Sequence, residues 1–238
     1  KYKVLLAENN EGYQNLMKIV SKGFVDGFYY KPRIDEEILR TYHTGIIALS
    51  ACLAGEIPRY LERNLYEEAK KAAERYREIF GDGNFFLELQ DHGIPMQRQV
   101  NQGILRLSKE LSIPLVATND CHYINADDWE PHDILLCIQT GKKVSDANRM
   151  RYEGGQYYVK SEEEMRELFR YIPEAIDNTH RIAERCNVEI EFGVTKLPRY
   201  DVPEGYTSWE YLNHLCRRGF AERYPEDDGT LKERLEYE

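Results

Sequence analysis

Three short apolar runs in this sequence each end in side chains that can bind a metal ion. The run IIALSAC ends at Cys52, FFLELQDH contains Glu88 and His92, and IPLVATNDCH contains Asp120 and His122. Short apolar runs bounded by turn residues predict buried strands. In a barrel or open sheet of alternating strands and helices, the carboxyl ends of the strands meet at one edge. We therefore expect these side chains to converge on one site.

Strands and helices alternate along the first half of the chain. Strands are predicted in KVLLA, GIIALSA, FFLELQ and IPLVAT. Helical spacing of apolar residues predicts helices between them: one capped by Asn10, one capped by Asp35, and two over residues 66–80 and 100–111. This β-α order predicts an α/β fold and favours a parallel sheet or barrel.

The pattern changes after Asn125. We expect a helix over 126–138, a short strand in QYYVK, and a helix that begins with a capping box formed by Ser161 and Glu164. A further helix is expected from Pro173 to Cys186, because proline is favoured at the first helical position.

The chain is expected to divide into two parts. The segment FGVTKLPRYDVPEG, residues 192–205, contains two prolines and two glycines and predicts a linker. An amphipathic helix over 208–224 and a charged tail follow. We therefore expect one domain over 1–195, and a linker with the start of another region over 196–238.

Composition excludes several classes of protein. With 238 residues, 42% of them hydrophobic, the chain can form a sizeable core. A formal net charge of −10 argues against a free-standing protein that binds DNA non-specifically. The charge is compatible with an acidic part of a larger DNA-processing complex. No apolar stretch has the roughly 20 residues of a membrane helix. The five scattered cysteines lack CxxC pairs, which suggests a reducing cytoplasm.

The D-x-H of Asp120 and His122 is the first candidate metal site. In an extended segment both side chains lie on one face and Cys121 on the other. The alternative is a polar strand end with a capping aspartate and a hydrogen-bonded histidine. Cys52 follows a buried strand and is either a zinc thiolate or a small core residue.

Glu88 and His92 are weaker candidates. Glu88 is an inward-pointing carboxylate of the barrel, a group that supports the metal ligands, or an ion-pair partner. His92 either supports the metal ligands or shapes a turn. The remaining histidines are expected to be structural or exposed: His43, His132, His180 and His214. No nucleotide-binding GxxxxGK[ST] or GxGxxG loop and no GxSxG elbow is present.

Six segments together resemble one family. They are VLLAENNEGYQNLMKIVS, GIIALSACLAGEIPR, FFLELQDHGIP, IPLVATNDCHYI, ILLCIQTGKKVSDANRMRYEG and AIDNTHRIAERCNVEIEFG. In this order they resemble the alpha subunit of bacterial DNA polymerase III, within its polymerase and histidinol phosphatase (PHP) domain. The resemblance implies a distorted TIM-like barrel of the (β/α)7 type, incomplete at its N-terminus, joined near residue 195 to a helical extension toward the palm.

The resemblance also implies a metal cluster. Cys52, Asp120 and His122 match family ligand positions, whereas Glu88 and His92 match a motif near the site. Zinc is the first expectation, with magnesium or manganese as alternatives. Tyr2 and Lys3 stand where relatives tend to have a histidine. The family's H-x-H segment is expected before residue 1 and the polymerase aspartates, with their magnesium, after residue 238. We therefore expect the segment alone to be inactive and to bind metal weakly.

The function implied is that of a replicative DNA polymerase, a nucleotidyltransferase, whose PHP site supports 3′ to 5′ exonuclease activity. The alternative is an inactive PHP scaffold that stabilises the polymerase and binds a proofreading subunit. A stand-alone phosphoesterase fits less well, because family-specific segments continue after residue 130. The implied partners are DNA, deoxynucleotides, the proofreading subunit and the sliding clamp, in the cytoplasm and without a membrane.

Overall fold

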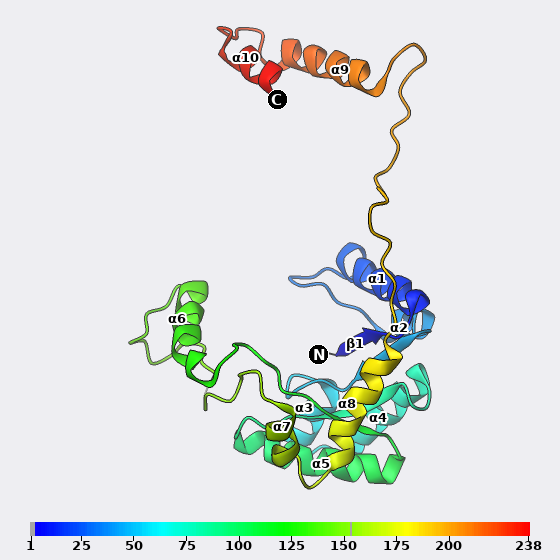
Figure 1. Ribbon diagram of the computed structural model, residues 1–238, viewed down its shortest axis with the longest axis vertical. Helices are drawn as coiled ribbons and strands as arrows, with labels where there is room; N and C mark the ends of the chain where they lie inside the picture. Colours follow the sequence, from blue (N-terminus) through cyan, green and yellow to red (C-terminus); the bar gives the residue numbers. More distant parts are fainter. Residues whose placement is uncertain (1–2, 153) are drawn as a thin grey trace. The chain divides into compact units, whose positions relative to one another are not determined.

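The structure is a computed structural model that describes residues 3–152 and 154–238 (Figure 1). Tyr2, one of the two positions that depart from the family pattern, lies outside these residues. The chain forms two compact units, Lys1–Glu189 and Ile190–Glu238. Within the described residues, no helix combines the length and the apolar composition that a membrane span requires.

A mixed four-stranded sheet lies at the centre of the first unit. Its strands, in the order β1-β2-β3-β4, are Val4–Ala7, Ile46–Leu49, Phe85–Leu89 and Leu115–Ala117. β2, β3 and β4 run parallel, as predicted, but β1 pairs antiparallel with β2. The expectation of a uniformly parallel sheet was therefore wrong at this edge, because an apolar run has the same composition whichever way its neighbour runs.

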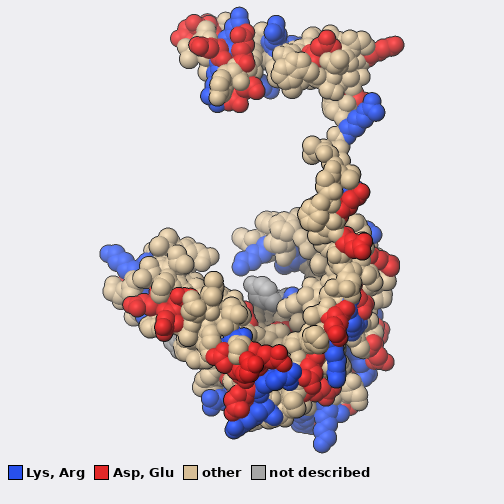
Figure 2. Space-filling view, viewed as in Figure 1, with Lys and Arg blue, Asp and Glu red and all other residues tan. Residues whose placement is uncertain are grey.

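Helices precede and follow the strands in the first unit. Their bounds are α1 Asn10–Val25, α2 Glu36–Thr41, α3 Glu56–Glu62, α4 Tyr66–Phe80, α5 Pro95–Leu111, the short 3-10 helix η1 Ala126–Asp128, α6 Trp129–Thr140, α7 Glu162–Leu168 and α8 Pro173–Arg185. The predicted bounds of α4 and the capping box of α7 are confirmed. On the face shown in Figure 2, acidic and basic side chains are interspersed over the surface of the first unit.

Three local predictions need correction. The N-cap of α1 is Asn9, not Asn10, because the Asn9 side chain accepts the Gly12 N–H at 2.9 Å. α5 begins at Pro95 rather than at Val100. The predicted strand QYYVK forms only an isolated bridge, in which Tyr158 pairs with Tyr123.

Three of the four strands of the sheet are buried on both faces. Every residue of β2, β3 and β4 is buried. The larger core cluster contains Ala48, Leu87 and the apolar face of α4, whereas Ile47, Phe86 and Val116 pack with Ile182 of α8. Two covering layers explain why these strands read as continuous apolar runs rather than as alternating ones.

The second unit contains two helices, α9 Ser208–Arg223 and α10 Thr230–Tyr237. α10 occupies part of what the sequence suggested was only a charged tail. None of the described residues in 190–238 is buried.

Candidate functional site

Cys52, His92, Asp120 and His122 follow the carboxyl ends of β2, β3 and β4, whereas Glu88 lies within β3. Two of these ends contain non-glycine residues in the left-handed region: Ala51, with φ 66°, just before Cys52, and Asp120, with φ 49°. The D-x-H is therefore not the regular extended segment that we predicted. Such backbone angles are strained for residues with a Cβ and are found where a chain turns sharply.

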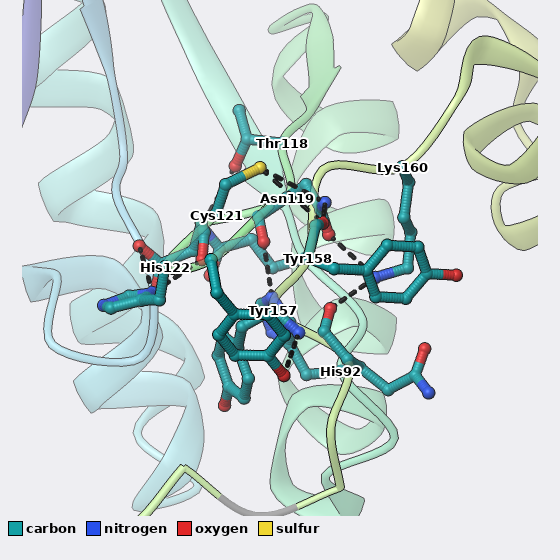
Figure 3. Close-up of polar contacts among 12 residues, drawn as sticks. His92, Thr118, Asn119, Cys121, His122, Tyr157, Tyr158 and Lys160 are labelled. Carbon is teal, nitrogen blue, oxygen red and sulfur yellow. Dashed lines mark hydrogen bonds and ion pairs between the residues drawn. The ribbon is translucent and has the colours of Figure 1, made fainter. Parts of the chain in front are cut away.

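Asp120 and His122 lie close together. Nδ1 of His122 is 2.8 Å from the Asp120 carbonyl oxygen and 4.0 Å from Oδ1. Because a carbonyl oxygen only accepts, Nδ1 carries the hydrogen, and the lone pair of the neutral ring is at Nε2. Cys121 points in another direction (Figure 3), with Sγ 3.8 Å from the Tyr158 carbonyl oxygen. His122 can thus bind a ligand or an ion through Nε2.

An aromatic wall surrounds His122, formed by Tyr152, Tyr157 and His132. Their ring centroids lie 4.2, 5.6 and 5.7 Å from the His122 ring. Burial raises the pKa of Tyr157 to about 12 and also raises the pKa of Tyr152, and the nearby Asp120 carboxylate adds to both shifts. Both phenols therefore keep their protons at neutral pH and can donate hydrogen bonds.

Glu88 is the most deeply buried carboxylate near these residues, with 4% of its surface exposed. Its Oε1 accepts from Thr118 Oγ1 at 2.5 Å and from Gln90 Nε2 at 3.2 Å, whereas Oε2 has no hydrogen-bond partner among residues 3–152 and 154–238. Burial raises its pKa, and the hydrogen bond from Thr118 opposes that shift. Glu88 and Cys52 line one small cavity of about 10 Å³, which is about the room one water molecule needs.

His92 is held by hydrogen bonds at both ring nitrogens. Nε2 donates to the Asn119 carbonyl oxygen at 2.6 Å, and Nδ1 accepts from Gln97 Nε2 at 2.8 Å. His92 is 2% exposed, and its ring stacks on the ring of Tyr157. Burial lowers the pKa of His92. With no free lone pair, His92 supports the site and does not bind an ion in this arrangement.

The other histidines have separate contacts, except for His132. His43 Nδ1 contacts the Arg40 carbonyl oxygen at 2.7 Å, His180 pairs with Glu184 at 3.3 Å, and His214 lies beside the ring of Tyr211. Sequence reasoning missed the contributions of Tyr152, Tyr157 and His132 to the wall. They are separated from the D-x-H by intervening helices and loops, and no spacing rule connects them to it.

Comparison with known proteins identifies the region. A family model for the PHP domain matches residues 1–92. The chain is 44% identical over 236 residues to DNA polymerase III subunit alpha of Treponema pallidum, which covers 99% of this chain and 20% of that protein. Nearly the whole chain is therefore similar to a part of DNA polymerase III alpha subunits, and its residues 1–92 match the PHP domain. It is also 46% identical over 237 residues to the Borreliella burgdorferi subunit, covering 99% of this chain and 21% of that protein.

A third relative agrees with this match. The chain is 41% identical over 231 residues to DNA polymerase III subunit alpha of Thermus aquaticus, which covers 93% of this chain and 19% of that protein. The chain therefore spans about a fifth of the length of these curated relatives. Cys52, Glu88 and His92 lie within the residues that match the PHP domain.

The side chains of the candidate site fit a divalent metal in part. A thiol, a carboxylate and an imidazole are all ligands that zinc accepts, and the unpartnered Oε2 of Glu88 is a further oxygen donor. In residues 3–152 and 154–238, however, no three His, Cys, Asp or Glu side chains gather in a metal-binding group. Asp120 and His122 lie 4.0 Å apart, and Cys52 lines a small cavity together with Glu88.

Proposed function

We propose that this chain is the PHP-domain part of a bacterial replicative DNA polymerase alpha subunit and that Cys52, Asp120 and His122 contribute ligands to a site for 3′ to 5′ phosphodiester hydrolysis. The observation that supports the site is the pairing of Asp120 with His122 at 4.0 Å, at the carboxyl end of β4, with Nε2 of His122 free to bind. Further ligands are needed, because a zinc ion takes about four.

The remaining parts of the proposal follow from the family. The four-stranded sheet forms part of a (β/α)7 barrel over residues 1–195, and 196–238 lead toward the palm. Zinc suits the mixed donor set best, with magnesium or manganese as alternatives. DNA, deoxynucleotides, the proofreading subunit and the sliding clamp are the proposed partners of the whole protein, in the cytoplasm.

The residues of the chain have distinct roles in this proposal. A bound divalent metal would supply a water of lowered pKa and stabilise charge on the phosphate. Tyr152 and Tyr157 keep their protons and donate hydrogen bonds to phosphate oxygens. Glu88 lies behind Cys52, and His92 fixes the ring of Tyr157 by stacking.

A second candidate is the inactive scaffold. It is favoured by the absence of a three-ligand group among the described residues and by exposed apolar side chains on α6. Ile134, Leu135 and Ile138 are 46%, 61% and 72% exposed. Exposed apolar side chains on one helix suit burial against another protein, such as a proofreading subunit.

Metal content and hydrolysis in the full-length protein distinguish the two candidates. We expect Asp120→Ala to lower metal affinity by about tenfold or more. Even the removal of a group that only hydrogen-bonds to a metal ligand lowers the affinity by about that factor. Hydrolysis of a 3′-labelled oligonucleotide should fall with it, while polymerisation is unchanged. Asp82→Ala is the matched control, because its carboxylate is 95% exposed and precedes β3. Unchanged metal content and hydrolysis in Asp120→Ala would refute the ligand assignment, and bound metal without hydrolysis would favour the scaffold.

A further inference from the structure

The connection between α1 and α2 exposes three consecutive aromatic side chains. Phe28, Tyr29 and Tyr30 are 59%, 60% and 85% exposed. They lie in the segment 27–33, which we call the aromatic loop, and Figure 1 shows this connection projecting from the helices. Aromatic rings carry large apolar surfaces, so adjacent exposed rings suggest a surface that another molecule covers.

The aromatic loop is held in one shape. A Cβ on Gly27 would lie 1.9 Å from the Arg33 carbonyl oxygen, so the two ends of the loop are in contact. The Tyr29 N–H donates to the Lys31 carbonyl oxygen at 3.1 Å, which closes a tight turn. Tyr30, at its tip, has φ 60°, a strained value for a bulky residue. A loop fixed in this way loses little conformational entropy when it binds.

Two cations share the turn with the rings. The Arg33 guanidinium lies 4.7 Å from the centroid of the Tyr29 ring, and Lys31 is next to Tyr30 in sequence. Within the part of the chain that the structure describes, neither Lys31 nor Arg33 forms an ion pair with a carboxylate. Their charge is therefore available to an anionic ligand.

The acidic neighbours of the aromatic loop are occupied elsewhere. Asp26 pairs with Lys22 at 2.8 Å, Asp35 caps α2 by accepting the Ile38 N–H at 3.0 Å, and Glu36 pairs with Arg75 at 2.5 Å. The aromatic loop itself, residues 27–33, contains two cationic residues and no acidic residue, on a chain whose formal net charge is −10.

We propose that the aromatic loop binds single-stranded nucleic acid, with bases stacked on Tyr29 and Tyr30 and phosphates paired with Lys31 and Arg33. Flat rings beside cations match the alternation of bases and phosphates in an unpaired strand. A duplex does not offer free base faces, and an apolar protein surface would leave both cations without partners. This binding does not depend on hydrolysis at Asp120, so the two proposals are tested separately.

Photo-crosslinking of the full-length protein tests the loop directly. An oligothymidylate that carries 5-iododeoxyuridine is irradiated with the protein in the presence of a chelator, and tryptic peptides are mapped. We expect an adduct on the peptide over residues 23–33, because the Lys31–Pro32 bond resists trypsin. Tyr30→Ala should lower the yield of this adduct by about fivefold or more. Lys31→Ala should reduce the slope of log affinity against log salt by about 0.7.

Tyr237→Ala is the matched control. Its ring is 80% exposed and lies 5.2 Å from the Arg234 guanidinium, so it offers the same groups outside the loop. The adduct on 23–33 should be unchanged in this variant, and circular dichroism should show that all variants are folded.

Results of three kinds would overturn the proposal. The first is crosslinking that occurs elsewhere but never on 23–33. The second is an equal adduct with a duplex of the same length, or an adduct that persists when Tyr29 and Tyr30 are both alanine. The third concerns hydrogen exchange of residues 23–33. If this exchange slows when the polymerase is assembled without DNA, but does not slow when the oligonucleotide is added, the loop belongs to a protein interface.

Discussion

The imidazole of His92 lies face to face with the phenol of Tyr157, with ring centroids 4.1 Å apart and planes 9° apart. Both residues are buried, at 2% and 6% exposure. The stack joins the segment after β3 to a segment that lies beyond α6 in the sequence. It thereby fixes the aromatic wall beside Asp120 and His122, so the stability of this stack affects the geometry of the candidate site.

Gln97 should be essential for the position of His92. Its Oε1 accepts the His92 N–H at 2.8 Å and its Nε2 donates to Nδ1 at 2.8 Å. Gln97→Leu leaves both buried groups of His92 without a partner, and each such group costs about 1–3 kcal/mol. We expect the free energy of unfolding, measured by urea denaturation of this chain, to fall by at least about 1 kcal/mol.

Gln99→Leu provides the comparison for this change. Gln99 lies on the same helix but is exposed, with one hydrogen bond of 3.3 Å to Asn64. Surface changes of this kind usually alter stability by less than about 0.5 kcal/mol. Equal losses in the two variants would show that the contacts of Gln97 with His92 contribute nothing specific.

Glu88 should make the stability of the chain depend on pH. Burial raises its pKa above the ordinary value of 4.5, so between these two values the folded chain binds more protons than the unfolded chain. The stability that Glu88 contributes is therefore fully present below its pKa in the unfolded chain. This stability is lost as pH rises through its pKa in the folded chain. Glu88→Gln removes this loss, and we expect the variant to be more stable than the wild type above that pKa.

Urea denaturation at a series of pH values measures the difference between Glu88→Gln and the wild type. Glu68→Gln is the control, since Glu68 is an exposed glutamate of α4. Its difference from the wild type should not change with pH in the same way. A constant difference between Glu88→Gln and the wild type from pH 4 to 8 would contradict the raised pKa.

The sequence predicts the buried elements of the fold better than its edges. Continuous apolar runs predicted β2, β3 and β4, because strands covered on both faces leave few polar positions. The direction of β1 was not predictable in this way, and the N-cap of α1 was misplaced by one residue since Asn9 and Asn10 are the same residue type. The bounds of α4 were predicted because its alanine-rich face and the following Gly81 mark them.

The candidate site was predictable only where it follows the strands. Asp120 and His122 lie close together because they are two residues apart. Their ligand roles, and that of Cys52, stay predictions. The stack of Tyr157 on His92 depends on how the chain returns after α6, and sequence spacing carries no information about that path. The left-handed angle of Asp120 was also hidden, since no glycine marks it.

Gly12 should tolerate no larger side chain. A Cβ at this buried position in the first turn of α1 would lie 1.8 Å from the Gly45 carbonyl oxygen. That oxygen also accepts the Glu8 N–H at 2.9 Å, so Gly12→Ala must displace the start of α1 or break this bond. Overpacking of this kind costs about 1–3 kcal/mol, and we expect a corresponding loss in urea denaturation.

Gly219→Ala should have the opposite effect. Gly219 lies inside α9, and no atom lies within 4 Å of a Cβ built on it. Alanine is favoured over glycine in a helix by about 0.8–1.0 kcal/mol, so the substitution should stabilise α9. Hydrogen exchange of the α9 amides should slow by up to about fivefold, the factor to which 1 kcal/mol corresponds. Faster exchange in Gly219→Ala would mean that α9 packs closely against another surface at this position, because only a displaced neighbour reverses the preference for alanine.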